Sequence, residues 1–242
     1  MNNNKQIAFI SVDNTKTFED KNLDELYVNQ WEEAAINTKT IVKLCEKIGL
    51  ITVNVLEEHP LWHISFASSF KNKNPFETIS YEEVTNWTEQ ENWLETGVAF
   101  TVKDLQKFLK KVWIQMLWPD HGVINTEWTK LQEPLEDKDF DIKVVKWNKW
   151  YKDAYSGFDD TNLDKILQKN QIKEILLWWV ATDYCVGDTA LDAVAKGYKV
   201  YIINEAVRWV SPKTTIAKIR ELEDKGVKFV ALDKIISKLK NL

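Results

Sequence analysis

The chain has 242 residues, of which 44% are hydrophobic and 29% charged, the composition of an ordinary globular protein. Its net charge of −5 offers no basic stripe for nucleic acid, and no apolar run approaches the ~18 residues of a membrane span. Two cysteines cannot make a disulfide framework and the N-terminus lacks a signal-peptide pattern, so we expect a cytoplasmic protein that binds neither nucleic acid nor membranes.

Apolar runs of strand length alternate along the chain with amphipathic helical patterns. In chain order, the expected strands are 6–12, 50–57, 113–118, 140–147, a run that begins at 174, 198–207 and 227–232. The expected helices are 32–49, 102–112, 162–171, 184–197, 211–226 and 233–242. This alternation predicts a three-layer α/β/α fold around a mostly parallel sheet of about six strands. We expect one domain over residues 1–242, in which the polar, weakly periodic stretch 67–101 forms a lid-like insertion.

Polar side chains follow several of these strands, and in such sheets the site lies beyond the carboxyl ends of the strands. The candidates are Asp13, Glu57, His59, His121, Lys146 and Cys185. Cys185 begins a predicted helix, whose dipole and free N–H groups favour a thiolate and could stabilise an oxyanion. A lone cysteine is more often inert packing, the role expected for Cys45 on the apolar stripe of helix 32–49. Asp13 and Lys146 could supply the base and the cation that a nucleophile needs, although strand-end charges are often only solvated or ion-paired.

The histidines indicate a metal site. Glu57 and His59 are two residues apart on an extended strand, so both side chains point the same way. Carboxylate and imidazole groups are ligands that a borderline divalent metal prefers, and His121 would complete the set. A chance cluster of loop histidines is the alternative, because His121 lies far downstream.

Five segments resemble the nicotinamidase branch of the isochorismatase-like cysteine hydrolases, over about residues 6–232. The first-strand motif is similar to "FISVDNTKTF", and the metal segments are similar to "EEHPLWHISFA" and "WPDH". The lysine segment is similar to "KWNKWYKDAYSGF", and the nucleophile segment to "VATDYCV" followed by "TALDAV". The resemblance implies a metal-dependent amidohydrolase that converts nicotinamide to nicotinate and ammonia through a thioester, in NAD salvage.

The resemblance also implies a role for each candidate residue. Cys185 would be the nucleophile, Asp13 the base and Lys146 the cation, with the backbone N–H groups of Ala181 and Cys185 as the oxyanion hole after a cis bond at Val180–Ala181. The metal, with zinc the first choice and iron or manganese the others, would be held by Glu57, His59 and His121. The aromatic walls of the ring pocket would be Phe18, Trp118 and Tyr155. Whether the chain forms a homo-oligomer and what His63 does are left open.

The sequence departs from the family pattern in three places. Glu57 replaces the usual metal aspartate, Thr15 and Thr17 replace other polar residues, and the stretch between His63 and His121 is longer than in compact members. Two alternatives therefore stay open. One is a related cysteine amidohydrolase acting on another small amide or carbamoyl compound, and the other is a non-catalytic metal-binding or interaction protein with the same fold. The intact Asp13, Lys146 and Cys185 count against the second, and vinyl-ether hydrolysis is disfavoured because that branch does not use the thiol.

Tryptophan and glycine occur in unusual proportion: 12 tryptophans against 7 glycines, where average usage predicts about 17 glycines. Ten tryptophans stand where the family pattern or a turn favours glycine. They are Trp31, Trp62, Trp93, Trp113, Trp128, Trp147, Trp150, Trp178, Trp179 and Trp209. We predict that the gene uses UGA for glycine and that these codons are translated here as tryptophan; a naturally Trp-rich variant is the alternative.

Overall fold

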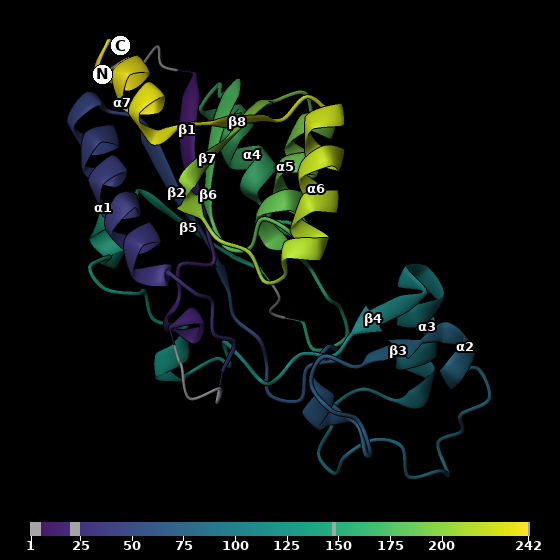
Figure 1. The fold of residues 1–242 in the computed structure, drawn as a ribbon. Coiled ribbons are helices and arrows are strands. Elements are labelled where there is room, and N and C mark those ends of the chain that lie inside the picture. The colour runs from purple at the N-terminus through teal and green to yellow at the C-terminus, as the bar shows by residue number, and fades with distance from the viewer. Residues whose placement is uncertain (1–5, 20–24, 147–148, 242) are drawn as a thin grey trace.

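The central sheet is built from β1 (Ile7–Val12), β2 (Ile51–Glu57), β5 (Ile142–Lys146), β6 (Glu174–Trp179), β7 (Lys199–Val207) and β8 (Lys228–Val230). The computed structural model describes residues 6–19, 25–146 and 149–241. Its strand order is β5-β2-β1-β6-β7-β8, and every neighbouring pair runs parallel. The predicted three-layer fold with about six mostly parallel strands is confirmed (Figure 1).

Helices cover both faces of this sheet (Figure 1). The described helices are α1 (Trp31–Ile48), α2 (Tyr81–Val84), α3 (Val102–Val112), α4 (Leu163–Lys169), α5 (Cys185–Ala195), α6 (Pro212–Asp224) and α7 (Leu232–Lys240), of which α2 and α3 lie apart from this sheet. α1 and α7 pack together on one face, while α4, α5 and α6 contribute to the core on the other. None of the described helices is long and apolar enough to cross a membrane.

The alternation of side chains along β1 divides the apolar core into two layers. Ile10 and Val12 face the layer beneath α4 and α5, whereas Phe9 faces the layer beneath α1. Cys45 lies fully buried in this second layer, as expected for packing. Burial on both faces explains why the strands read as continuous apolar runs.

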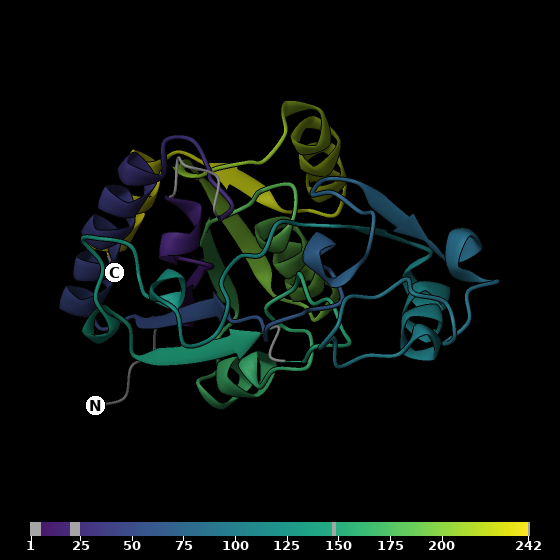
Figure 2. The ribbon, with the colours of Figure 1, turned by 90° about the horizontal axis from the view of Figure 1, so that it is seen from below.

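A small lobe stands beside the sheet, as Figure 2 shows from below. Its two strands, β3 (Thr78–Ser80) and β4 (Ile114–Met116), pair antiparallel and belong to a separate sheet. α3 begins at a capping box between Thr101 and Asp104 and buries Leu105 and Leu109 in the lobe's own core. The run predicted as a strand at 113–118 is therefore short and lies outside the main sheet. Residues 67–101 belong to this lobe, and their action as a lid stays a prediction.

The direction of the chain reverses between β1 and β6. From β1 the chain moves outward to β2 and β5, and from β6 it moves the other way to β7 and β8. Ligands of doubly wound sheets bind beyond the carboxyl ends of the strands at such a switch point. Asp13 directly follows β1, and the segment after β6 leads to Cys185.

Candidate active site

Three of the candidate side chains meet at the switch point. Asp13 follows β1, Lys146 ends β5 and Cys185 begins α5. Lys146 Nζ lies 3.0 Å from Asp13 Oδ2 and 3.3 Å from Cys185 Sγ. All three are buried, with Asp13 and Lys146 at most 1% exposed. One ammonium group therefore bridges the carboxylate and the thiol, and we call these three residues the triad.

Burial dominates the electrostatics of the triad. It raises the pKa of Asp13, a rise that the charge of Lys146 opposes. It also raises the pKa of Cys185 well above its ordinary value, again against Lys146. Burial alone would lower the pKa of Lys146, but Asp13, Cys185 and Glu57 together raise it above the ordinary value. Lys146 is thus an ammonium at neutral pH, Cys185 rests as a thiol, and Asp13 is a stronger base than a free aspartate.

The turn before Cys185 packs tightly against the helix that follows it. The Val180–Ala181 peptide is cis, and the Ala181 carbonyl accepts the N–H of Val186 at 3.0 Å. Gly187 allows this packing, because a Cβ there would lie 2.5 Å from the carbonyl oxygen of Thr182. The turn thereby holds Ala181 and Cys185 on the wall of one pocket.

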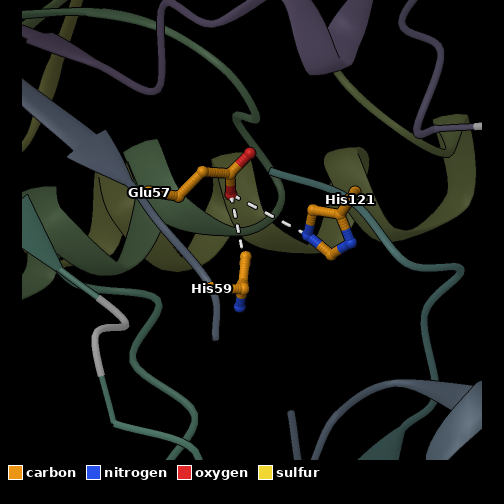
Figure 3. A group of neighbouring side chains, drawn as sticks. All are labelled: Glu57, His59 and His121. Atoms are coloured by element: carbon orange, nitrogen blue, oxygen red, sulfur yellow. Dashed lines mark ion pairs between the residues drawn. The ribbon is translucent and has the colours of Figure 1, made fainter. Parts of the chain in front are cut away.

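Glu57, His59 and His121 form a second buried cluster, which we call the metal group. Glu57 ends β2, His59 follows two residues later, and His121 comes from the loop after β4. Glu57 Oε2 lies 3.8 Å from His59 Nε2 and 3.9 Å from His121 Nε2 (Figure 3). One ligand atom from each residue lies within 4.8 Å of the others, which is close enough for one ion.

The chemistry of the metal group fits a divalent metal. Burial lowers the pKa of His59 well below its ordinary value and that of His121 to about 4, so both imidazoles are neutral, as ligands must be. His121 Nδ1–H donates to the Pro119 carbonyl at 2.8 Å, which leaves Nε2 as the ligating atom. Glu57 Oε1 is buried and accepts no hydrogen bond from the described residues. A buried carboxylate oxygen in that position is stabilised by a cation.

His63 lies beside the metal group but serves another purpose. Its Nδ1 lies 2.7 Å from Ser65 Oγ, and its Nε2 lies 3.1 and 3.0 Å from the carbonyl oxygens of Lys149 and Lys152. Since carbonyl oxygens only accept hydrogen bonds, Nε2 carries the proton and Nδ1 accepts from the serine. His63 thus braces the segment after β5, which answers the question that the sequence left open.

The two clusters open onto one pocket. Its wall includes Glu57, His121 and Cys185 on the reactive side and all three expected aromatic residues, Phe18, Trp118 and Tyr155. The remaining lining residues are Leu26, Val180, Ala181, Tyr184 and Val210. Tyr184 was missed in the sequence although it directly precedes the cysteine; Leu26 gave no signal. This mostly apolar lining, with a few polar groups on one side, suits a ligand that is mostly apolar and carries one or two polar groups.

A buried polar network that sequence reasoning also missed supports the aromatic wall. Tyr155 Oη accepts the indole N–H of Trp118 at 3.0 Å, and Gln115 Nε2 donates to Asp153 Oδ2 at 2.6 Å. Burial raises the pKa of Asp153 to about 7, and its hydrogen bonds to Gln115 and Tyr155 oppose this rise. Asp153 thus interacts with Tyr155 of the pocket wall and has a pKa raised to about 7.

The chain is similar in sequence to an isochorismatase domain and to nicotinamidases. A family model described as "Isochorismatase domain" matches residues 115–234. Nicotinamidase from Escherichia coli (strain K12) is 35% identical over 126 residues, which are 49% of this chain and 59% of that enzyme. The matched segment thus spans less than two thirds of this relative.

Solved structures match over nearly the whole chain. The structure of Pyrococcus horikoshii pyrazinamidase in complex with zinc has a TM-score of 0.68 at 26% identity and covers 94% of this chain and 99% of that one. The yeast nicotinamidase bound to the inhibitor nicotinaldehyde has a TM-score of 0.73 at 25% identity and covers 93% of this chain and 99% of its own.

Proposed function

We propose that this chain, which resembles isochorismatase-domain hydrolases in sequence and in fold, is a metal-dependent nicotinamidase, which hydrolyses nicotinamide to nicotinate and ammonia. The observation that carries the proposal is the position of Lys146 Nζ, 3.0 Å from Asp13 and 3.3 Å from Cys185. Cys185 shares one small pocket with Glu57 and His121 of the metal group, and the relatives named above support the choice of a pyridine amide as substrate.

In the proposed first step, Cys185 Sγ attacks the amide carbonyl carbon of nicotinamide while Asp13 accepts the thiol proton. Lys146 stabilises the developing thiolate and keeps Asp13 ionised. The backbone N–H groups of Ala181 and Cys185 stabilise the oxyanion. Asp13 then passes the proton to the amide nitrogen, the carbon–nitrogen bond breaks, and ammonia leaves a nicotinoyl thioester on Cys185.

In the second step, water attacks the thioester carbonyl and Asp13 accepts one of its protons. The carbon–sulfur bond breaks, nicotinate forms, and the proton returns to Cys185 Sγ. The sum is one amide and one water converted to one acid and one ammonia, with the triad restored.

The pocket wall orients the pyridine ring for this attack. Phe18, Trp118 and Tyr155 supply aromatic faces against which a flat ring packs. A divalent metal held by the metal group, for which zinc is our first choice ahead of iron or manganese, would supply a Lewis acid for the pyridine nitrogen. We place the reaction in NAD salvage in the cytoplasm.

Ammonia release from nicotinamide tests the proposal, in protein that carries glycine at the ten tryptophan positions named above. Cys185→Ala should lower kcat by ~10³-fold or more, because the nucleophile is lost. Cys45→Ala is the matched control, since Cys45 is buried in α1, a helix on one face of the sheet, and should leave catalysis intact. Mass spectrometry of quenched protein should detect a nicotinoyl adduct on Cys185.

Activity that survives in Cys185→Ala would refute the thiol mechanism. Nicotinaldehyde, the inhibitor in the yeast structure, should compete with nicotinamide and lose affinity in Cys185→Ala. If the folded, metal-loaded protein does not hydrolyse nicotinamide but releases ammonia from another small amide, that compound becomes the proposed substrate. No release from any amide would leave the non-catalytic alternative.

A further inference from the structure

Glu25 is a buried carboxylate that neither the triad nor the metal group uses. It is 6% exposed and precedes Leu26, which lines the pocket. Burying a carboxylate is costly unless strong donors satisfy it, so its partners indicate what it does.

Glu25 accepts a hydrogen bond from the backbone of Gly122, the residue that follows His121. The N–H of Gly122 donates to Glu25 Oε2 at 2.8 Å and to Thr17 Oγ1 at 2.6 Å. The Thr17 hydroxyl also donates to Glu25 Oε2. Hydrogen bonds to a charged acceptor are the strong ones, so this pair clamps one peptide group firmly.

The clamped peptide lies between two metal-group residues. Gly122 directly follows His121, and its carbonyl accepts the backbone N–H of His59 at 2.9 Å. A Cβ on Gly122 would lie 3.4 Å from Glu57 Cγ, so its backbone packs directly against the carboxylate. The hydrogen bonds of Gly122 thus connect Glu25 to the backbone beside His121 and to the backbone of His59.

We infer that Glu25 is a positioning residue, which fixes the Gly122 peptide and thereby holds His59 and His121 in place for the metal. The inference rests on the proposed metal-dependent function only through the metal group itself. Groups that orient metal ligands through hydrogen bonds typically change metal affinity by 10–100-fold, which is about the effect expected here.

Zinc titration against a chromophoric chelator tests the role of Glu25. Glu25→Ala should weaken zinc binding about 10–100-fold, and Glu25→Gln, which keeps an oxygen acceptor, should weaken it less. Glu127→Gln is the control, because Glu127 is exposed and pairs with Lys130 at the surface. Folding of each variant is checked by circular dichroism.

Unchanged zinc affinity in Glu25→Ala would overturn the inference, and so would a lower Tm with unchanged affinity, since that is a merely structural effect. Weakened zinc binding in a protein that never hydrolyses nicotinamide would uphold the positioning role while the proposed function fails. If Glu25→Ala does not fold, Glu25→Gln decides the question. A wild-type zinc affinity in Glu25→Gln would also contradict the inference.

A different observation concerns the backbone at three tryptophans. Trp62 has a φ of 61°, Trp113 a φ of 68° and Trp179 a φ of 93°. L side chains rarely adopt this region, and for bulky residues it is strained, whereas glycine enters it freely. Five of the chain's glycines lie there as well, at Gly49, Gly97, Gly122, Gly197 and Gly226.

The surroundings of these tryptophans do not compensate for the strain. Trp113 ends α3 in the position where helices most often have glycine. It is 56% exposed, and its ring contacts that of Tyr81 at 5.5 Å. Trp179 is fully buried, yet its indole N–H has no partner among the described residues. The indole N–H of Trp179, unpartnered in the described part of the chain, adds to the cost of that residue's backbone conformation.

We infer that the ten tryptophans which stand at glycine-like positions are encoded by UGA and are glycines in the native protein. Nine of the ten lie in the described part of the chain, and Trp147 lies outside it. Trp118, which hydrogen-bonds Tyr155 and lines the pocket, and Trp87 are then the true tryptophans.

The codons decide this second inference. UGA at Trp62, Trp113 and Trp179 with UGG at Trp118 supports it, and UGG at any of the first three overturns it. In protein, Trp113→Gly should raise Tm by about 2–4 °C or more as strain is relieved. Trp87→Gly is the control and should lower Tm, because Trp87 packs against the core of the small lobe. A lower Tm in Trp113→Gly would contradict the conformational argument.

Discussion

Replacing Lys146 with methionine would leave Asp13 buried without the cation that faces it. Lys146 Nζ and Asp13 Oδ2 are 3.0 Å apart, and both side chains are fully buried. At that distance and an effective dielectric constant of ~20 their attraction is about 5 kcal/mol. Removing one partner of a buried pair costs about 3–5 kcal/mol because an uncompensated charge remains. We therefore expect the free energy of unfolding to fall by this amount.

Urea denaturation at neutral pH measures the loss. Lys143→Met is a closely matched control, because Lys143 lies on the same strand but is 52% exposed and pairs with Glu58 at the surface. Such surface pairs contribute about 0–1 kcal/mol. A loss of 3–5 kcal/mol corresponds to a fall in Tm of roughly 6–20 °C in a chain of this length.

The double variant Asp13→Asn/Lys146→Met completes a double-mutant cycle. Removing both charges should cost less than the sum of the single losses, since no lone buried charge remains. Two results would refute the reasoning: Lys146→Met as stable as Lys143→Met, or single losses that simply add. Alkylation of Cys185 should also slow in Lys146→Met, because Lys146 opposes the rise in the thiol pKa.

Three further perturbations test the neighbouring groups. Chelation of the metal should abolish ammonia release, and added zinc should restore it. Zinc at a hundred times its Kd should raise the free energy of unfolding by about 2.7 kcal/mol. Equal thermal melts with and without zinc would contradict a native metal site. Asp153 has a pKa raised to about 7. Between about pH 4 and 7 its carboxyl group is therefore protonated in the native state but ionised in the unfolded chain. The free energy of unfolding falls as pH rises through that window. Asp153→Asn cannot ionise, so its stability relative to the wild type should rise over the same window by at most about 4 kcal/mol; parallel pH–stability curves would rule this out. Tyr155→Phe removes the acceptor of the Trp118 indole N–H and should cost about 1–3 kcal/mol by urea denaturation, with no loss counting against the network.

The sequence predicted the residues that follow strands and missed those that do not. Asp13, Glu57 and Lys146 were found because parallel strands end at a common edge, whatever the details of packing. Glu25 lies in no strand or helix and matches no motif, so only the hydrogen bond to Gly122 reveals it. Asp153 also lies in no strand or helix, and its partner Gln115 comes from the small lobe, so the sequence did not indicate their contact.

The run at 113–118 shows a second limit. Its apolar residues fit a core strand equally well, but they pair with β3, and no local signal states which partner a strand will choose. His63 has the residue type and spacing of a metal ligand, yet backbone carbonyls reach its Nε2. Tertiary contacts determine which strand pairs with 113–118 and what His63 binds, and residue spacing in the sequence does not report such contacts.

Glu57 and Lys146 are direct cross-strand partners in the pairing of β2 with β5. The metal group and the triad are thus joined by a single backbone register. Side chains alternate between the faces of a sheet, so a slip of one residue would send Lys146 to the opposite face and separate it from both Asp13 and Glu57. An insertion or deletion within β5 would therefore remove Lys146 from the triad and from its place beside Glu57.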